Sequence, residues 1–150
     1  MKLAEALKER ADIQTRISQM QVRLNLNARV QEGEKPSEDP AELLRELDEL
    51  ISRLEELIHR INITNASTQD EGVTLTVLMA KRDCLRKKTD ILRSFLNEAS
   101  DIGGRATYSE IKMKSTVNVA KKRKELDKLS EELRQTDGRI QQLNWLTDLL

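Results

Sequence analysis

The chain has 150 residues, a length that suits one domain with a modest core. Charged residues make up 35% and aromatic residues 2% of it, a composition typical of long helices rather than of a β-sandwich or an α/β enzyme. Small-molecule pockets usually draw on aromatic side chains, and the chain has only Phe95, Tyr108 and Trp145. We therefore expect neither an enzyme nor a bound cofactor.

Positive and negative side chains are equal in number, 26 of each, so no overall field draws the protein to nucleic acid or to an anionic membrane. Two segments depart from this balance: residues 34–56 hold nine acidic and three basic residues, whereas residues 112–124 hold basic residues and no acidic one. Either these helix faces neutralise each other, or one of them is a docking patch. The candidate basic patch consists of Lys112, Lys114, Lys121, Lys122, Arg123 and Lys124.

Three further features bear on the compartment. A single cysteine, Cys84, allows no disulfide within the chain, and the first ten residues contain no apolar core of a secretion signal. No apolar run approaches the roughly 18 residues that a membrane span needs. On these grounds we expect a cytoplasmic protein that does not associate with a membrane.

A first helix is expected over residues 2–27, because apolar residues recur there at alternating spacings of three and four. Such a stripe, here called a seam, packs one helix against another. Arg10 and Asn27 interrupt it. Asn27 either fixes the register and the choice of partner, or both residues lie near frayed helix ends. The seam consists of Leu3, Ala6, Ile13, Ile17, Met20 and Leu24.

A loop over residues 31–39 and a second helix over residues 40–63 follow. Asp39 is placed to cap this helix, with Pro40 in its first turn and Glu42 reaching back in a capping box. Its uninterrupted seam predicts the best buried helix of the protein. His59 lies beside the seam without a second His or Cys one turn away, so we expect no metal site. The seam consists of Leu43, Leu47, Leu50, Leu54, Leu57 and Ile61.

Residues 62–72 are rich in Asn, Thr, Ser and Asp, which predicts an ordered polar turn. A third helix is expected over residues 74–100, where Arg82 and Thr89 interrupt the seam and Met79 and Phe95 widen it. Its apolar seam residues are Leu75, Leu78, Leu85, Leu92, Leu96 and Ala99.

The segment after the third helix predicts a short strand or hairpin. Gly103 and Gly104 end the helix, and polar and apolar residues then alternate along residues 108–116. A lone strand is unstable, so it would pair with a second loop or with its own copy in another subunit, or it would not form. Asn118 is placed to cap the next helix.

The last helix is expected over residues 118–150, with Lys122, Thr136 and Thr147 interrupting its seam. The four helices together predict an all-α fold: a single domain over residues 1–150, in which four long helices form an antiparallel coiled-coil bundle. A seam is stable only when another helix covers it, within the chain or between chains, so we expect a homo-oligomer. The apolar seam residues are Val119, Leu126, Leu129, Leu133, Ile140, Leu143 and Leu150.

Three segments, 31–40, 60–65 and 134–145, resemble a family of small bacterial helical proteins labelled septicolysin-like. The resemblance covers nearly the whole chain and implies no catalytic residue or cofactor. It singles out polar positions that the seams do not require, either as a partner site or as residues that serve local structure, with Trp145 as a core or interface anchor. These positions are Arg60, Asn62, Thr64, Asn65, Arg139, Gln142, Asn144 and Trp145.

The interpretation we favour is a structural or interaction protein, a self-associating helical bundle that presents polar loop ends to an unknown protein partner. One alternative is a membrane-active, haemolysin-like protein, as the family label implies. Another is nucleic-acid binding through residues 112–124, for which only Tyr108 lies near enough in sequence to stack on a base. No catalytic motif is present to favour an enzyme.

Overall fold

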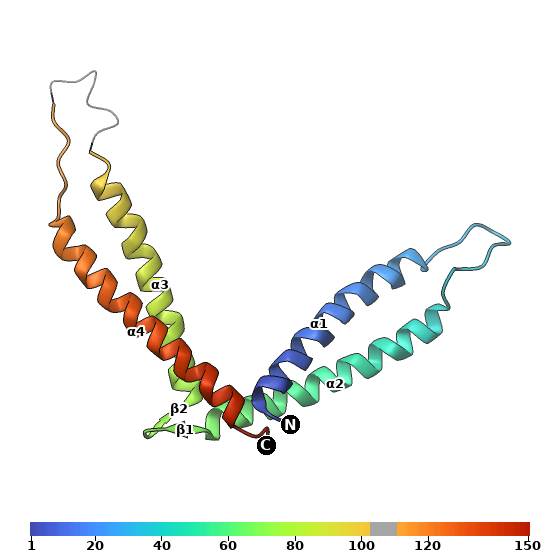
Figure 1. The fold of residues 1–150 in the computed structure, drawn as a ribbon. Coiled ribbons are helices and arrows are strands. Elements are labelled where there is room, and N and C mark those ends of the chain that lie inside the picture. The colour runs from blue at the N-terminus through green and yellow to red at the C-terminus, as the bar shows by residue number, and fades with distance from the viewer. Residues whose placement is uncertain (103–110) are drawn as a thin grey trace. The chain divides into compact units, whose positions relative to one another are not determined.

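The computed structural model describes residues 1–102 and 111–150 (Figure 1). It confirms an essentially all-α fold, since four helices account for most of the described residues and the two strands have two residues each. The elements are α1 (Leu3–Leu26), α2 (Pro40–Ser67), β1 (Gln69–Asp70), β2 (Val73–Thr74), α3 (Leu75–Ser100) and α4 (Val119–Leu146).

The chain forms two compact units, which we describe separately. Unit 1 contains residues 1–70 and 143–150, and unit 2 contains residues 71–142. That all 150 residues form one domain, and that the four helices pack as a coiled coil, stay predictions.

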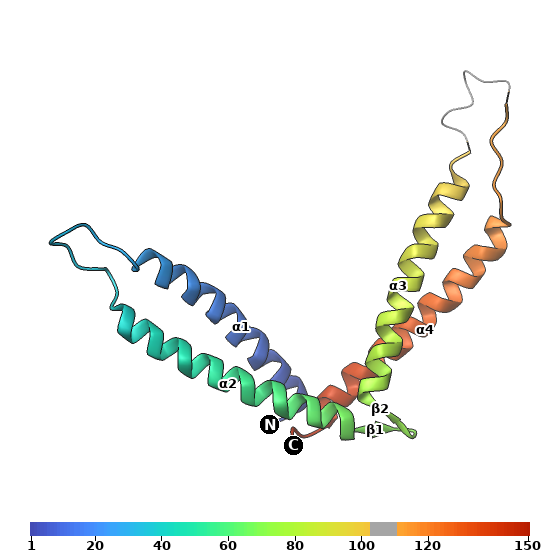
Figure 2. The same cartoon turned by 180° about the vertical axis from the view of Figure 1, so that it is seen from behind.

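In unit 1, α1 and α2 lie side by side and antiparallel (Figures 1 and 2). Each helix buries part of the seam that its sequence predicts, mostly at seven-residue spacing. The other seam residues, Ile17, Leu24, Leu47 and Leu54, are half-buried. The backbones of α1 and α2 approach closely along their length. The core residues of this pair are Leu3, Ala6, Ile13, Met20, Leu43, Leu50, Leu57 and Ile61.

The loop between α1 and α2 is fastened at both of its ends. Asn27 is buried; its side-chain amide donates to the carbonyl of Arg23 (2.9 Å) and accepts from the amide of Glu38 (3.0 Å). Asn27 is thus an ordered helix-end residue that ties down the loop. Asp39 caps α2 as predicted, accepting from the amide of Ala41 at 2.9 Å.

α2 continues to Ser67, so the predicted turn over residues 62–72 is wrong for its first six residues. The hydroxyls of Thr64 and Ser67 donate to backbone carbonyls one turn earlier, at 2.8 Å each. These two bonds satisfy the hydroxyls within the helix, so the two residues do not end it. The turn comes later, at Glu71 and Gly72, whose φ angles of 50° and 81° suit a two-residue hairpin between β1 and β2.

In unit 2, α3 and α4 also run side by side (Figures 1 and 2), but their backbones approach each other less closely than those of α1 and α2. Two ion pairs link them: Lys81 with Glu132 at 2.7 Å and Arg82 with Asp137 at 3.8 Å. The predicted interruption Arg82 therefore reaches a carboxylate on the opposite helix. The buried residues are Leu75, Thr89, Leu96, Leu126, Thr136 and Ile140.

The predicted strand before α4 is wrong over residues 111–116, which form neither strand nor helix, while its residues 108–110 lie outside the described part of the chain. Alternation alone does not supply the partner strand that a β-ladder needs. Asn118 does cap α4, accepting from the amide of Lys121 at 3.1 Å. The helix ends at Leu146 rather than at residue 150, because the last residues pair with the start of the chain.

Candidate functional site

The first and last residues of unit 1 pair with each other. The amide of Leu3 donates to the carbonyl of Thr147, and the amide of Leu149 donates to the carbonyl of Met1, both at 2.9 Å. The Lys2 ammonium lies 2.9 Å from the Asp148 carboxylate. Leu149 is buried as a result, so this short antiparallel bridge closes one end of the unit's core.

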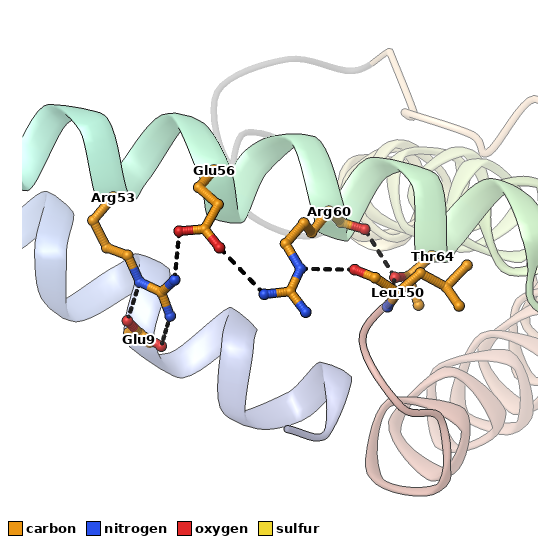
Figure 3. Close-up of polar contacts among 6 residues, drawn as sticks. All are labelled: Glu9, Arg53, Glu56, Arg60, Thr64 and Leu150. Atoms are coloured by element: carbon orange, nitrogen blue, oxygen red, sulfur yellow. Dashed lines mark hydrogen bonds and ion pairs between the residues drawn. The ribbon is translucent and has the colours of Figure 1, made fainter.

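α2 holds the end of the chain through Arg60 and Thr64 (Figure 3). The Nε of Arg60 donates to the carbonyl oxygen of Leu150 at 2.7 Å, and the amide of Leu150 donates to the Thr64 hydroxyl at 3.0 Å. Thr64 is completely buried and its hydroxyl also donates to a carbonyl, so it uses both its donor and an acceptor position.

A line of charged side chains continues from Arg60 to α1 (Figure 3). Arg60 contacts Glu56 at 3.3 Å, Glu56 contacts Arg53 at 2.7 Å, and Arg53 donates to both carboxylate oxygens of Glu9 at 2.7 and 3.1 Å. The hydrogen bond from Arg53 lowers the pKa of Glu56, assisted by the charge of Arg53 and by Arg60. These groups satisfy one another, so the line fastens α2 to α1 and carries no free reactive group. We call this line, together with the bonds of Arg60 and Thr64 to Leu150, the clamp.

Of the other positions that the sequence singled out, Asn65 is buried and Asn144 is half-buried, while Asn62 and Gln142 are exposed. Arg139 contacts Glu71 at 3.8 Å. Trp145 is 63% exposed, so it does not anchor a core in this chain, and its alternative role as an interface anchor stays a prediction. Arg60 and Thr64 thus form part of the clamp. Asn62, Asn65, Asn144 and Trp145 also belong to unit 1, whereas Arg139 and Gln142 belong to unit 2.

A different feature of unit 2 has the shape of a binding site. A groove of about 880 Å³ lies between α3 and α4. Its apolar wall includes Ile91 and Phe95, which are 63% and 44% exposed, together with the half-buried Leu92 and Leu129. The greater separation of these two helices leaves side chains on both of them uncovered.

Lysines form the rim of this groove: Lys87 and Lys88 on α3, and Lys122 and Lys128 on α4. Lys122 pairs with Glu125 at 3.0 Å. The other three lysines make no ion pair with the residues that the structure describes. The groove therefore combines exposed apolar surface with unneutralised positive charge.

The predicted basic patch lies only partly at the groove. Lys112 and Lys114 are exposed on the segment before α4, and Arg123 donates to the Ser100 hydroxyl at 3.1 Å. Residues 121–124 are consecutive on a helix, so their side chains point in different directions around the helix axis and do not share one face. Of the six residues, Lys122 alone lines the groove.

Sequence reasoning missed Ile91, Lys87, Lys88 and Lys128. A signal was present: Ile91-Leu92 and Phe95-Leu96 are apolar pairs at positions where a seam requires only one residue. Two adjacent apolar residues widen a helical stripe by about 100°, more than one neighbouring helix covers.

Within residues 1–102 and 111–150 we find no group of three or more His, Cys, Asp or Glu side chains arranged to hold a metal ion. Nor does a helix in those ranges have the length and apolarity needed to cross a membrane.

Replacing Thr64 with valine should destabilise unit 1 by about 1 kcal/mol, because the amide of Leu150 loses its acceptor, the buried Thr64 hydroxyl, while the side-chain volume is kept. Urea unfolding measures this loss, and hydrogen exchange at Leu150 should become faster. Ser67→Ala is the matched control, since it removes a similar hydroxyl bond within α2 that is not linked to the tail. Equal effects of the two substitutions would contradict the role of Thr64 in the clamp.

Acid should weaken the protein through Glu38, Glu56 and Asp148, whose pKa values are lowered by hydrogen bonds from Arg23, Arg53 and Lys2 respectively. A carboxyl group with a lowered folded-state pKa stabilises above its ordinary pKa, which is 4.5 for Glu56, and this contribution disappears as the pH falls through the folded-state value. The melting temperature should therefore drop below that pH. Glu56→Gln should melt lower at neutral pH and show a shallower acid dependence; identical slopes would refute the contribution of Glu56.

A comparison with curated proteins gives no match. Among solved structures, the chain is similar to one described as the crystal structure of a functionally unknown conserved protein from Corynebacterium diphtheriae. The two are 41% identical with a TM-score of 0.92, and the match covers 100% of this chain and 99% of that one.

The family resemblance inferred from the sequence was wrong. No septicolysin-like protein appears among the matches, and the three short segments that carried the resemblance are polar helix ends, a loop and a seam, which unrelated helical proteins share. The model that matches, over residues 10–149, is described as a family of unknown function (DUF6847), and the chain belongs to that family.

Proposed function

We propose that the chain is an interaction protein, and that unit 2 binds an acidic amphipathic helix in the groove between α3 and α4. The single observation that carries this proposal is the exposed apolar wall at Ile91 and Phe95 beside three lysines that make no ion pair with a described residue: Lys87, Lys88 and Lys128. The binding surface differs from the polar loop ends favoured by sequence reasoning, because the clamp already occupies Arg60 and Thr64.

The apolar part of the proposal follows from the cost of leaving large side chains in water. Each Å² of apolar surface that a partner covers contributes roughly 25 cal/mol, before the entropy of association is subtracted. A helix that lies in a groove supplies apolar side chains at spacings of three and four, which matches the spacing from Ile91 to Phe95.

The lysines specify the sign of the partner's charge. Their alkyl stems extend the apolar wall while the ammonium groups reach water, where glutamates or aspartates on the edge of a bound helix meet them. A basic partner helix would be repelled by Lys87, Lys88 and Lys128 together. The groove thus favours an acidic amphipathic helix over a basic one.

Nucleic-acid binding and membrane lysis remain untested predictions that the groove does not support as well. A phosphate backbone needs a continuous basic track, whereas the basic residues of 121–124 point around α4. Catalysis is no part of the proposal: Glu125 is paired with Lys122, and Cys84 is a single exposed thiol at the groove.

Phe95→Asp should weaken the binding of an acidic helix at least about tenfold, or about 1.4 kcal/mol, because it places a carboxylate on the apolar wall. The probe is a fluorescently labelled synthetic peptide with leucines at helical spacing and glutamates between them, followed by anisotropy. Val77→Asp is the matched control: Val77 is on the same helix and 55% exposed, but it does not line the groove. Wild-type protein that fails to bind, or equal binding by both variants, would rule the proposal out.

A further inference from the structure

α2 carries a second apolar stripe, on a face that α1 does not cover. Leu44, Ile51 and Ile58 are 51%, 45% and 38% exposed. Each directly follows a buried leucine of the seam and lies seven residues from the next, so the three share one face of the helix. A shallow cavity of about 420 Å³ lies along Ile51 and Ile58. We call these three residues the outer stripe.

The charges beside the outer stripe differ from those on the side of α2 that faces α1. Glu46 lies 3.7 Å from both Arg16 and Arg23, and Glu56 pairs with Arg53 and Arg60. Asp48 and Glu55, which lie next to the outer stripe by helical geometry, make no ion pair with the described residues. Arginines thus pair with Glu46 and Glu56 on the side of α2 that faces α1, whereas Asp48 and Glu55 beside the outer stripe have no such partner among the described residues.

The outer stripe of one copy fits the chemistry of the groove of another. We infer that the acid-flanked outer stripe of α2 occupies the lysine-rimmed groove between α3 and α4 of a second copy of the chain. This inference rests on the proposed function and names the partner of the groove. It places Asp48 and Glu55 against Lys87, Lys88 and Lys128, and it covers Ile91 and Phe95 with Leu44, Ile51 and Ile58.

The lengths of the two surfaces are compatible. From Leu44 to Ile58 the stripe rises about 21 Å, and the groove residues of α3, Cys84 to Phe95, rise about 16 Å at 1.5 Å per residue. Each copy carries one outer stripe and one groove, so each copy can bind a partner through either surface. Two copies that exchange stripes reciprocally form a closed dimer, whereas one-directional docking extends into longer assemblies.

Charge reversal tests the pairing. Wild-type protein at micromolar concentration should have a mass above that of a single chain in sedimentation equilibrium, and D48K/E55K and K87E/K88E should each shift it to the monomer. An equimolar mixture of the two variants should regain the wild-type mass, because every stripe then meets a groove of opposite charge. E32K/E34K is the matched control, since it reverses two exposed acidic residues of the α1–α2 loop and should leave the mass unchanged.

Recovery in the mixture also shows that both variants are folded. A wild-type monomer at every concentration, variants with the wild-type mass, or a mixture that stays monomeric would each overturn the inference. The labelled acidic peptide separates this failure from that of the proposed function: D48K/E55K should still bind it, and K87E/K88E should lose binding at least about tenfold. If the protein binds the peptide but stays monomeric, the groove is a binding site for an acidic helix, but a second copy of the chain is not its partner.

Discussion

Two helices that pack only against each other bury one stripe of each. The consequence is clearest in unit 1, where Ala6, Ile13 and Met20 on α1 and Leu43, Leu50 and Leu57 on α2 are buried at seven-residue spacing. Leu43, Leu50 and Leu57 are buried, whereas Leu44, Ile51 and Ile58 after them are not. A helix with apolar pairs at seven-residue spacing therefore has more apolar surface than a single neighbour covers. The hydrophobic effect favours covering this surplus, which is why we propose it as a binding surface.

The two units use their polar residues differently. In unit 1 the backbones are close, and arginines on both helices pair with carboxylates of the other helix: Arg53 with Glu9, and Arg23 with Glu46. The clamp and the paired chain ends add further links within this unit. In unit 2 the helices are farther apart and are linked by Lys81–Glu132 and Arg82–Asp137 at one part of their length. Farther along the two helices, toward Phe95 and Lys122, their side chains do not fill the space between them, and the groove lies there. Because α3 and α4 are farther apart than α1 and α2, part of their apolar seam stays exposed instead of being buried in a core.

Heptad spacing predicted the four helices to within a few residues at most ends, because a seam and its caps are local features of the sequence. Asn118, Asp39 and Pro40 act as their types predict. The errors arose where a local rule was overridden: Thr64 and Ser67 stay helical through bonds to earlier carbonyls, and residues 147–150 leave the helix because they pair with residues far away in sequence. The candidate site was harder to predict, because the distance between α3 and α4 decides whether Ile91 and Phe95 are covered, and no residue spacing encodes it.

The claim on which these interpretations depend is that the surplus apolar faces of α2 and α3 are contact surfaces between copies. Hydrogen–deuterium exchange of the wild-type protein at increasing concentration tests it most directly, because covering a helix face suppresses its local opening. Exchange should slow with concentration in residues 44–58 and 84–95, and it should stay constant around Val22 and Leu26 on α1, which are exposed and lie outside both surfaces. Exchange that is independent of concentration in residues 44–58 and 84–95 would contradict the claim.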